Sequence, residues 1–122
     1  MIEMLPDMPE GVSGFKVSGR ASGEDLRNFK PTLEKMLQGG EVRIVEVIAP
    51  TYEGFGPGGL TEDLKLGFGT LIHHHSAFKR IAVVTDKEWA IHTLQALSWM
   101  VPGEIALFRL DEIEQAKEWA AG

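Results

Sequence analysis

The stretch V-R-I-V-E-V-I at residues 42–48 is β-branched and almost continuously apolar. Such a run is typical of a central strand that other elements cover on both faces. Two similar runs follow, I-A-V-V at residues 81–84 and I-A-L-F at residues 105–108. Because helix-length segments separate the three runs, the sequence predicts parallel strands joined by right-handed crossovers.

The segment before residues 42–48 has the apolar periodicity of a helix. Its start is marked by Ser22 and Asp25, a variant of the capping box, and its end by Gly39-Gly40. Pro31 interrupts the stripe, so we expect a kink there. The apolar positions recur at spacings of three and four: Leu26, Phe29, Leu33, Met36 and Leu37.

Three further helices are expected. The first begins near Leu60, where residues 60, 64, 68 and 71 form an apolar stripe. The second starts at a capping box formed by Thr85 and Glu88 and runs to residue 100, before Pro102-Gly103. The last is capped by Asp111 and Glu114 and continues to about residue 120.

The N-terminal region predicts two further strands. Residues 1–5 form an apolar run that Pro6 ends, and residues 12–19 alternate in the manner of a strand. The tight connection between them favours an antiparallel edge. The expected fold is therefore one α/β domain over residues 1–122, in the order β-β-α-β-α-β-α-β-α. It would have a mostly parallel five-stranded sheet, an antiparallel edge strand and four helices.

Composition excludes several classes of function. The chain has no cysteine, which excludes disulfides and thiolate chemistry, and its 12 basic and 18 acidic residues give a net charge of −6. Nucleic acid is an unfavourable partner, because phosphate neutralisation needs basic clusters and the basic residues here are scattered. The N-terminal residues lack the basic flank and apolar run of a signal peptide, so we expect a cytoplasmic protein.

The stretch I-A-V-V-T-D-K-E-W at residues 81–89 resembles the signature segment of the SpoIIAA-like proteins, also described as STAS/SEC14 domains. P-G-E at residues 102–104 and L-D-E at residues 110–112, which precedes a helix with Ala116 and Trp119, are also similar to that family. The resemblance in element order covers essentially the whole chain. It implies a fold like that of the anti-sigma-factor antagonists, with ligand binding or reversible membrane association as suggested activities.

One departure from the antagonists bears on regulation. They carry a phosphorylatable Ser at the start of the helix after the central strand, whereas residues 55–63 here read F-G-P-G-G-L-T-E-D. Thr61 is followed by Glu62 and Asp63, so a phosphate there would meet existing negative charge. The resemblance therefore does not carry the phosphorylation switch to this chain.

Two motifs that suggest ligands have simpler explanations. Residues 73–75 are three consecutive His, but neighbours on a helix point ~100° apart and cannot share one metal ion. We assign no metal site to them. The glycine-rich residues 54–59 lie between a strand and a helix, yet they match neither the P-loop nor the dinucleotide spacing. This segment is better interpreted as a flexible flap over an apolar pocket.

No catalytic constellation is recognised. Catalysis needs a nucleophile with a base, or paired acids with shifted pKa values. Ser22, Thr61 and Asp86 are explained as residues at helix starts, and His92 has no identifiable companion. We expect a non-enzymatic protein without a cofactor.

The helix over residues 87–100 is unusually apolar, because no charge follows Glu88 until Glu104. It is either buried, against the sheet or a dimer partner, or it faces an apolar ligand or a membrane. With no Lys or Arg after Lys87, it would contact a membrane only weakly. Our first hypothesis is a domain that binds an apolar small molecule or lipid at the carboxyl ends of the strands. The candidate ligand-binding residues are Tyr52, Phe55, Leu60, Leu64, Phe68, Trp89 and Leu97.

The alternative is a protein-interaction module resembling the anti-sigma-factor antagonists. It would dock a regulatory partner through the helix starts at Thr61 and Thr85. Homodimerisation through the apolar helix is compatible with either hypothesis.

Overall fold

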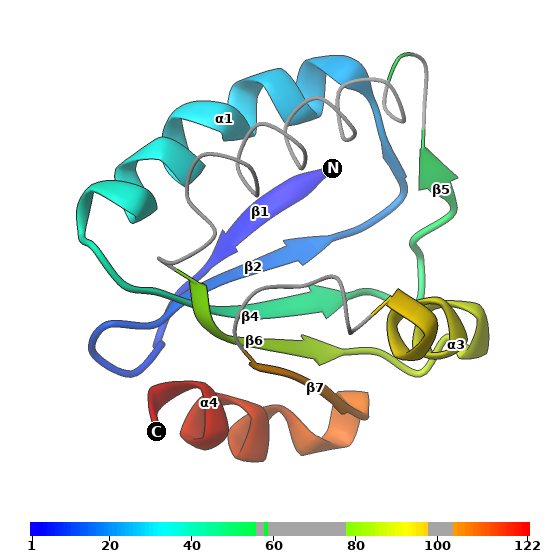
Figure 1. The fold of residues 1–122 in the computed structure, drawn as a ribbon. Helices are drawn as coiled ribbons and strands as arrows, with labels where there is room; N and C mark the ends of the chain where they lie inside the picture. Colours follow the sequence, from blue (N-terminus) through cyan, green and yellow to red (C-terminus); the bar gives the residue numbers. More distant parts are fainter. Residues whose placement is uncertain (56–57, 59–77, 98–103) are drawn as a thin grey trace.

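A five-stranded sheet in the order β1-β2-β4-β6-β7 forms the centre of the computed structural model, which describes residues 1–55, 58, 78–97 and 104–122 (Figure 1). Strand β1 is antiparallel to β2, and the other three neighbouring pairs are parallel. The predicted mostly parallel sheet with an antiparallel edge is therefore confirmed. The strands are β1 (Ile2–Leu5), β2 (Ser13–Val17), β4 (Val42–Ile48), β6 (Phe78–Val84) and β7 (Glu104–Phe108).

Strands β4 and β6 lie inside the sheet, as their apolar, β-branched runs predict, whereas the equally apolar β7 forms an edge. Val45 in β4 and Val84 in β6 are fully buried. Side chains alternate between the two faces of a strand, so β4 supplies both layers of the core. Val45 and Val47 pack on one face, and Ile44 and Ile48 pack on the other.

Helices cover both faces. Helix α4 (Ile113–Ala121) packs against Val45 and Val84 through the buried Ala116 and Ala120. Helices α1 (Gly23–Gln38) and α3 (Glu88–Leu97) lie on the opposite side of the sheet from α4 (Figure 1). The predicted helix beginning near Leu60 lies outside the described residues.

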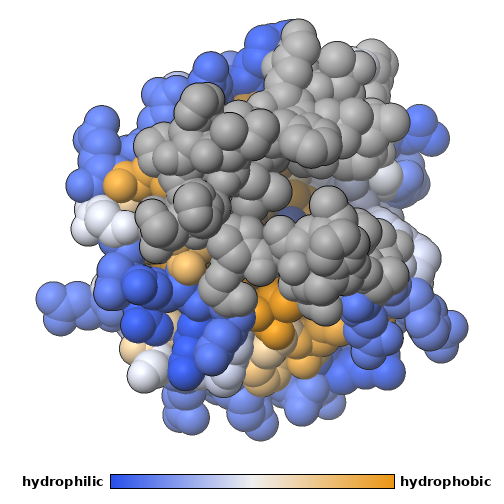
Figure 2. All heavy atoms as spheres, in the orientation of Figure 1, coloured by the Kyte–Doolittle hydropathy of each residue, from blue (hydrophilic) through white to orange (hydrophobic). Residues whose placement is uncertain are grey.

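Strand β7 forms the second edge of the sheet, and its residues 105–108 are only half buried. Figure 2 shows hydrophobic residues reaching the surface in the region where Figure 1 draws β7 and α4, with hydrophilic residues around them.

The predicted boundaries of α1 are confirmed. Ser22 Oγ accepts from the Asp25 N–H at 3.1 Å, and Asp25 Oδ2 accepts from the Ser22 N–H at 3.0 Å, which completes a capping box. Gly39 is the C-cap, and Gly40 follows with φ 91°. Pro31 does not break the helix, because it lies on the exposed side, where water can hydrate the backbone.

Two predicted helix starts are wrong in detail. Thr85 Oγ1 accepts from the Lys87 N–H at 3.1 Å, so it closes a turn, and α3 begins later, at Glu88. The predicted cap at Asp111 is replaced by a 3₁₀ helix, η3 (Leu110–Glu112), where Glu112 Oε1 accepts from the Arg109 N–H at 2.8 Å. At Thr85 a nearer backbone N–H competes for the side chain that the sequence pattern assigned to a cap, and at the last helix Glu112 caps the 3₁₀ turn that precedes α4.

A second, two-stranded sheet was not predicted. It joins β3 (Arg20–Ala21) to β5 (Gly54–Phe55) in parallel. The Glu53 N–H donates to the Gly19 carbonyl at 2.6 Å, and Arg20 Nε lies 3.4 Å from Glu53 Oε2. The first part of the predicted flap, residues 54 and 55, is therefore paired with the segment after β2. Two-residue strands leave no periodicity to recognise in a sequence.

Candidate functional site

Tyr52 and Trp89 form a stacked aromatic pair at one end of the central sheet. Their ring centroids are 6.0 Å apart, and the ring planes differ by 29°. Tyr52 follows the carboxyl end of β4, and Trp89 follows the carboxyl end of β6. Because β4 and β6 are adjacent and parallel, their carboxyl ends bring these two rings to the same edge of the sheet.

The backbone around Tyr52 fixes its ring. The Ala49 N–H donates to the Val17 carbonyl at 2.9 Å, and the Tyr52 N–H donates to the Ala49 carbonyl at 3.0 Å. The half-buried Tyr52 side chain packs against the core cluster that contains Ile48 and Val83.

Trp89 is placed on the outer side of α3. The next residue, Ala90, is 2% exposed and packs against the same core cluster, whereas Trp89 is 54% exposed. Neighbouring residues on a helix point ~100° apart, so anchoring Ala90 to the core turns the indole of Trp89 outward. Trp89 thus offers water an apolar surface that Tyr52 supports from one side.

Among the predicted ligand-binding residues, the structure brings Tyr52 and Trp89 together. For Phe55 in β5 and Leu97 in α3, the structure describes only the backbone. Leu60, Leu64 and Phe68 lie outside the described residues.

The apolar helix predicted over residues 87–100 is partly solvated. Glu88, His92 and Gln95 of α3 are exposed, and Ala90 supplies the contact with the core. None of the helices that the structure describes is long and apolar enough to cross a membrane.

The remaining candidates divide into two groups. Residues 73–75 and Thr61 lie outside the described residues. Thr85, at one of the two helix starts considered for docking a partner, is fully buried, so its own side chain does not reach the surface. The reason is tertiary, because the Thr85 N–H donates to the Phe108 carbonyl at 2.9 Å and this contact draws the residue into the sheet.

Within the described ranges, no group of three or more His, Asp or Glu side chains is arranged to hold a metal ion.

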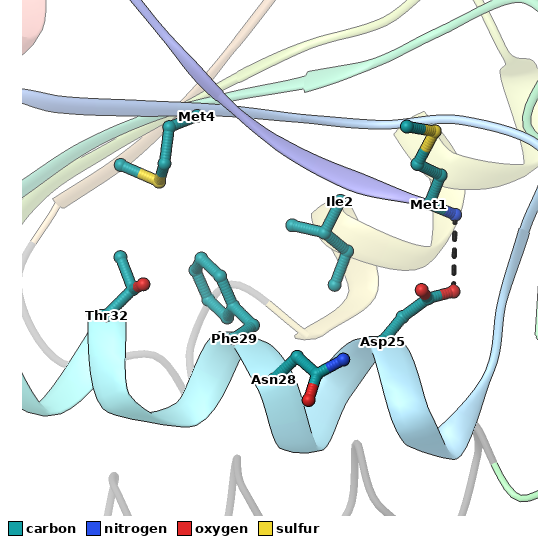
Figure 3. Close-up of a pocket in the computed structure, with 7 residues that line it drawn as sticks. All are labelled: Met1, Ile2, Met4, Asp25, Asn28, Phe29 and Thr32. Carbon is teal, nitrogen blue, oxygen red and sulfur yellow. Dashed lines mark ion pairs between the residues drawn. The ribbon is translucent and has the colours of Figure 1, made fainter.

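A cavity of about 290 Å³ lies between β1 and α1, and sequence reasoning missed it (Figure 3). Its apolar wall is formed by Ile2, Met4 and Phe29, and the Phe29 ring lies 5.0 Å from that of Phe15. Periodicity did place Phe29 on the inner stripe of the helix, but the gap beside it depends on how β1 and α1 pack. The cavity is lined by Met1, Ile2, Met4, Asp25, Asn28, Phe29 and Thr32.

Asp25 brings a carboxylate to one end of this cavity. The backbone N–H of Ser22, which donates to Asp25 Oδ2, holds the pKa of this carboxyl below its ordinary value of 3.8. The Met1 ammonium lies 3.4 Å from the same oxygen and acts in the same direction on the pKa (Figure 3). The carboxylate is therefore ionised at neutral pH.

The mixed sheet, with helices on both faces and connections at the carboxyl ends of its parallel strands, defines an open α/β domain. The chain belongs to the SpoIIAA-like family, whose model matches residues 12–121. This match confirms the resemblance seen in the sequence.

One solved structure shows the same fold. It is an uncharacterised protein of the DUF3478 family with a SpoIIAA-like fold, from Shewanella loihica PV-4. The two chains are 27% identical and superpose with a TM-score of 0.73, over 98% of this chain and 93% of the other. A comparison with curated proteins gave no match.

Proposed function

We propose that this chain is a non-enzymatic binding domain that takes an apolar or lipid-like ligand on the surface formed by Tyr52 and Trp89. The observation that carries the proposal is the stacked pair itself, in which Trp89 is 54% exposed. An indole that stacks on a tyrosine and is still 54% exposed is suited to contact an apolar group.

The position of the pair supports this proposal. In open α/β sheets, ligands bind outside the carboxyl ends of the strands, and both rings follow such ends. The loops that carry the rings are also held by backbone hydrogen bonds, at Ala49 to Val17 and at Thr85 to Phe108. A preorganised surface loses less conformational entropy when a ligand binds.

The charges beside the pair narrow the class of ligand. Glu53 follows Tyr52 but forms an ion pair with Arg20 at 3.4 Å, which offsets its charge. Glu88 precedes Trp89, is exposed and would disfavour an anionic head group, while an uncharged apolar body could still cover the rings. The proposed ligand is therefore neutral, and any contact with a membrane would be weak and mainly hydrophobic.

The family relationship favours a second candidate, a protein-interaction module resembling the anti-sigma-factor antagonists. The fold is compatible with such a role. The buried Thr85 removes one of the two docking residues first considered, so a partner would have to contact another part of the surface.

The test uses Nile red as a neutral apolar probe, with the purified full chain and the variants Trp89→Ala and His92→Ala. His92 is an exposed residue of the same helix and serves as the matched control. We expect the wild type and H92A to enhance Nile red fluorescence equally. We expect W89A to bind the probe roughly tenfold more weakly, as for the loss of an aromatic anchor worth ~1.4 kcal/mol.

Flotation with neutral phosphatidylcholine vesicles and native mass spectrometry complete the test. A co-purified acyl species or flotation that W89A abolishes would support a lipid-like ligand. Equal Nile red binding by a folded W89A would refute the proposed surface. A stable dimer that buries Trp89 and takes no probe would favour the interaction module.

A further inference from the structure

Strand β1 has a free backbone edge among the described residues. It is the outermost strand of the five-stranded sheet, and its register pairs Ile2 with Val17 and Met4 with Phe15. Met1 and Ser18 exchange both backbone hydrogen bonds, at 2.7 and 2.9 Å. Hydrogen-bonded and non-bonded pairs alternate in an antiparallel ladder, so Ile2 and Met4 belong to non-bonded pairs. Their N–H and C=O groups therefore point away from β2.

The cavity between β1 and α1 lies directly beside this edge. Ile2 and Met4, whose backbone groups point outward, also line the cavity with their side chains (Figure 3). Met4 is 50% exposed, and Phe29 supplies an aromatic wall from α1. An extended chain that paired with β1 would place alternate side chains toward this cavity, because successive residues of a strand point to opposite faces. Methionine side chains adapt readily to different apolar partners.

The charge of the whole chain favours a cationic partner. Asp25 is the one ionisable side chain among the seven lining residues, and the Met1 ammonium, 3.4 Å from Asp25 Oδ2, offsets its charge, whereas the chain as a whole carries a net charge of −6. Asn28 and Thr32 follow on α1 at helical spacing and add polar groups along the same wall. The exposed Glu24 adds a further negative charge near the start of α1.

We propose that the edge of β1 and the groove beside α1 bind an extended segment of a partner protein by strand addition, with an apolar side chain in the cavity and a basic side chain near the exposed Glu24 at the start of α1. Main-chain hydrogen bonds to Ile2 and Met4 would supply part of the affinity, and the groove would select the sequence. This site is formed by β1 and α1, and the proposal does not depend on the function of the Tyr52 and Trp89 surface.

The probe is the peptide Ac-KVKVKV-NH₂, titrated into the ¹⁵N-labelled full chain and followed by NMR. We expect it to shift the amide signals of Ile2 and Met4 more than those of β7, with affinity that falls as salt concentration rises. A peptide N-methylated at alternate residues lacks the N–H groups needed for pairing and should not bind. The acidic peptide Ac-EVEVEV-NH₂ should not bind either.

Two matched variants test the groove itself. Asn28→Lys adds a positive charge among the lining residues, whereas Gln38→Lys adds the same charge at the exposed far end of α1. We expect N28K to bind Ac-KVKVKV-NH₂ roughly fivefold more weakly, as for two like charges ~4 Å apart in water, and Q38K to bind it almost as the wild type does.

A third variant tests the backbone edge. Met4→Pro removes one outward N–H while the bonded pairs at Glu3 and Leu5 remain, and edge strands tolerate proline. Weaker binding by a folded M4P would support strand addition, and Met4→Ala would separate the backbone effect from loss of the side chain. Equal binding of the N-methylated peptide, or shifts confined to residues around Trp89, would overturn the proposal, as would equal affinities of N28K and Q38K.

Discussion

Arg80 holds Trp119 by two separate contacts. Its guanidinium carbon lies 5.1 Å from the centroid of the indole ring, and its Nη1 donates to the Trp119 carbonyl at 2.7 Å. The neighbouring Arg43, which is paired with Arg80 in the sheet register, donates Nη1 to the Ala120 carbonyl at 2.9 Å. Two arginines of the sheet thus donate to carbonyls in the last turn of α4, where the Trp119 carbonyl also accepts from the Gly122 N–H at 3.2 Å.

Replacing Arg80 should weaken the attachment of α4. We expect Arg80→Met to lower the free energy of unfolding by about 2 kcal/mol, because a charged hydrogen bond, a cation–π contact and the ion pair with Glu104 at 3.0 Å are lost together. Arg20→Met is the matched control, since Arg20 forms an ion pair with Glu53 in which both side chains are 66% exposed. Its cost should stay within about 1 kcal/mol. Urea denaturation measures the free energy of unfolding of both variants, and an equal loss of stability in the two would contradict the role assigned to Arg80.

The carboxylate of Asp25 should contribute to stability in a pH-dependent way. Its pKa is lowered in the folded protein, chiefly by the Ser22 backbone N–H, so its contribution is complete above the ordinary pKa of 3.8. This contribution is lost as the pH falls through the folded-state pKa. We therefore expect Asp25→Asn to lower the urea midpoint at pH 7, and the difference from the wild type to shrink below about pH 4. A constant difference down to pH 2.5 would show that the ionised form plays no part.

The two glycines after α1 should respond oppositely to alanine. Gly39 has φ −75° and ψ −8°, and a Cβ there would meet the Met36 carbonyl oxygen at 3.4 Å, an ordinary contact. We expect Gly39→Ala to raise stability by roughly 0.5 kcal/mol, because the unfolded chain loses freedom. Gly40 has φ +91°, a conformation that strains other residues, so Gly40→Ala should cost about 1–2 kcal/mol. Thermal melts of the two variants compare them directly, and equal shifts would contradict the role of backbone conformation.

Thr85 should tolerate neither loss of its hydroxyl nor added charge. Thr85→Val leaves the Lys87 N–H without its acceptor and should cost about 1 kcal/mol. Thr85→Glu would place a carboxylate at a fully buried position and should prevent folding. Thr51→Glu, at an exposed position, should fold normally. Circular dichroism measures whether each variant folds, and phosphopeptide mapping after treatment with a Ser/Thr kinase measures whether Thr85 is accessible. A stable T85E, or phosphorylation of Thr85 in the native protein, would contradict the burial of this residue.

The sheet was predictable because its strands carry strong local signals. The apolar runs of β4 and β6 placed these strands at the centre, and Pro6 and the tight connection placed β1 at an antiparallel edge. Ser22 with Asp25, and Gly39 with Gly40, also marked the limits of α1 correctly. These signals succeed because the residues that cause each structure lie within a few positions of it in the chain.

The candidate site was predictable only in part. That Tyr52 and Trp89 would meet followed from their positions after two adjacent parallel strands. Local patterns failed at Thr85, which was assigned to a helix cap and instead lies buried beside the last strand. The small sheet of β3 and β5 left no signal, since two residues cannot display a period.

The sequence by itself determined the family, the order and direction of the main strands, and the presence of an aromatic residue after β4 and after β6. Each of these depends on residue type and local spacing. Only the tertiary structure decided that Trp89 faces outward while Ala90 is buried, that two arginines hold the end of α4, and that a cavity opens between β1 and α1. These features depend on how distant segments pack, and close packing is a property of the whole folded chain that no local pattern encodes.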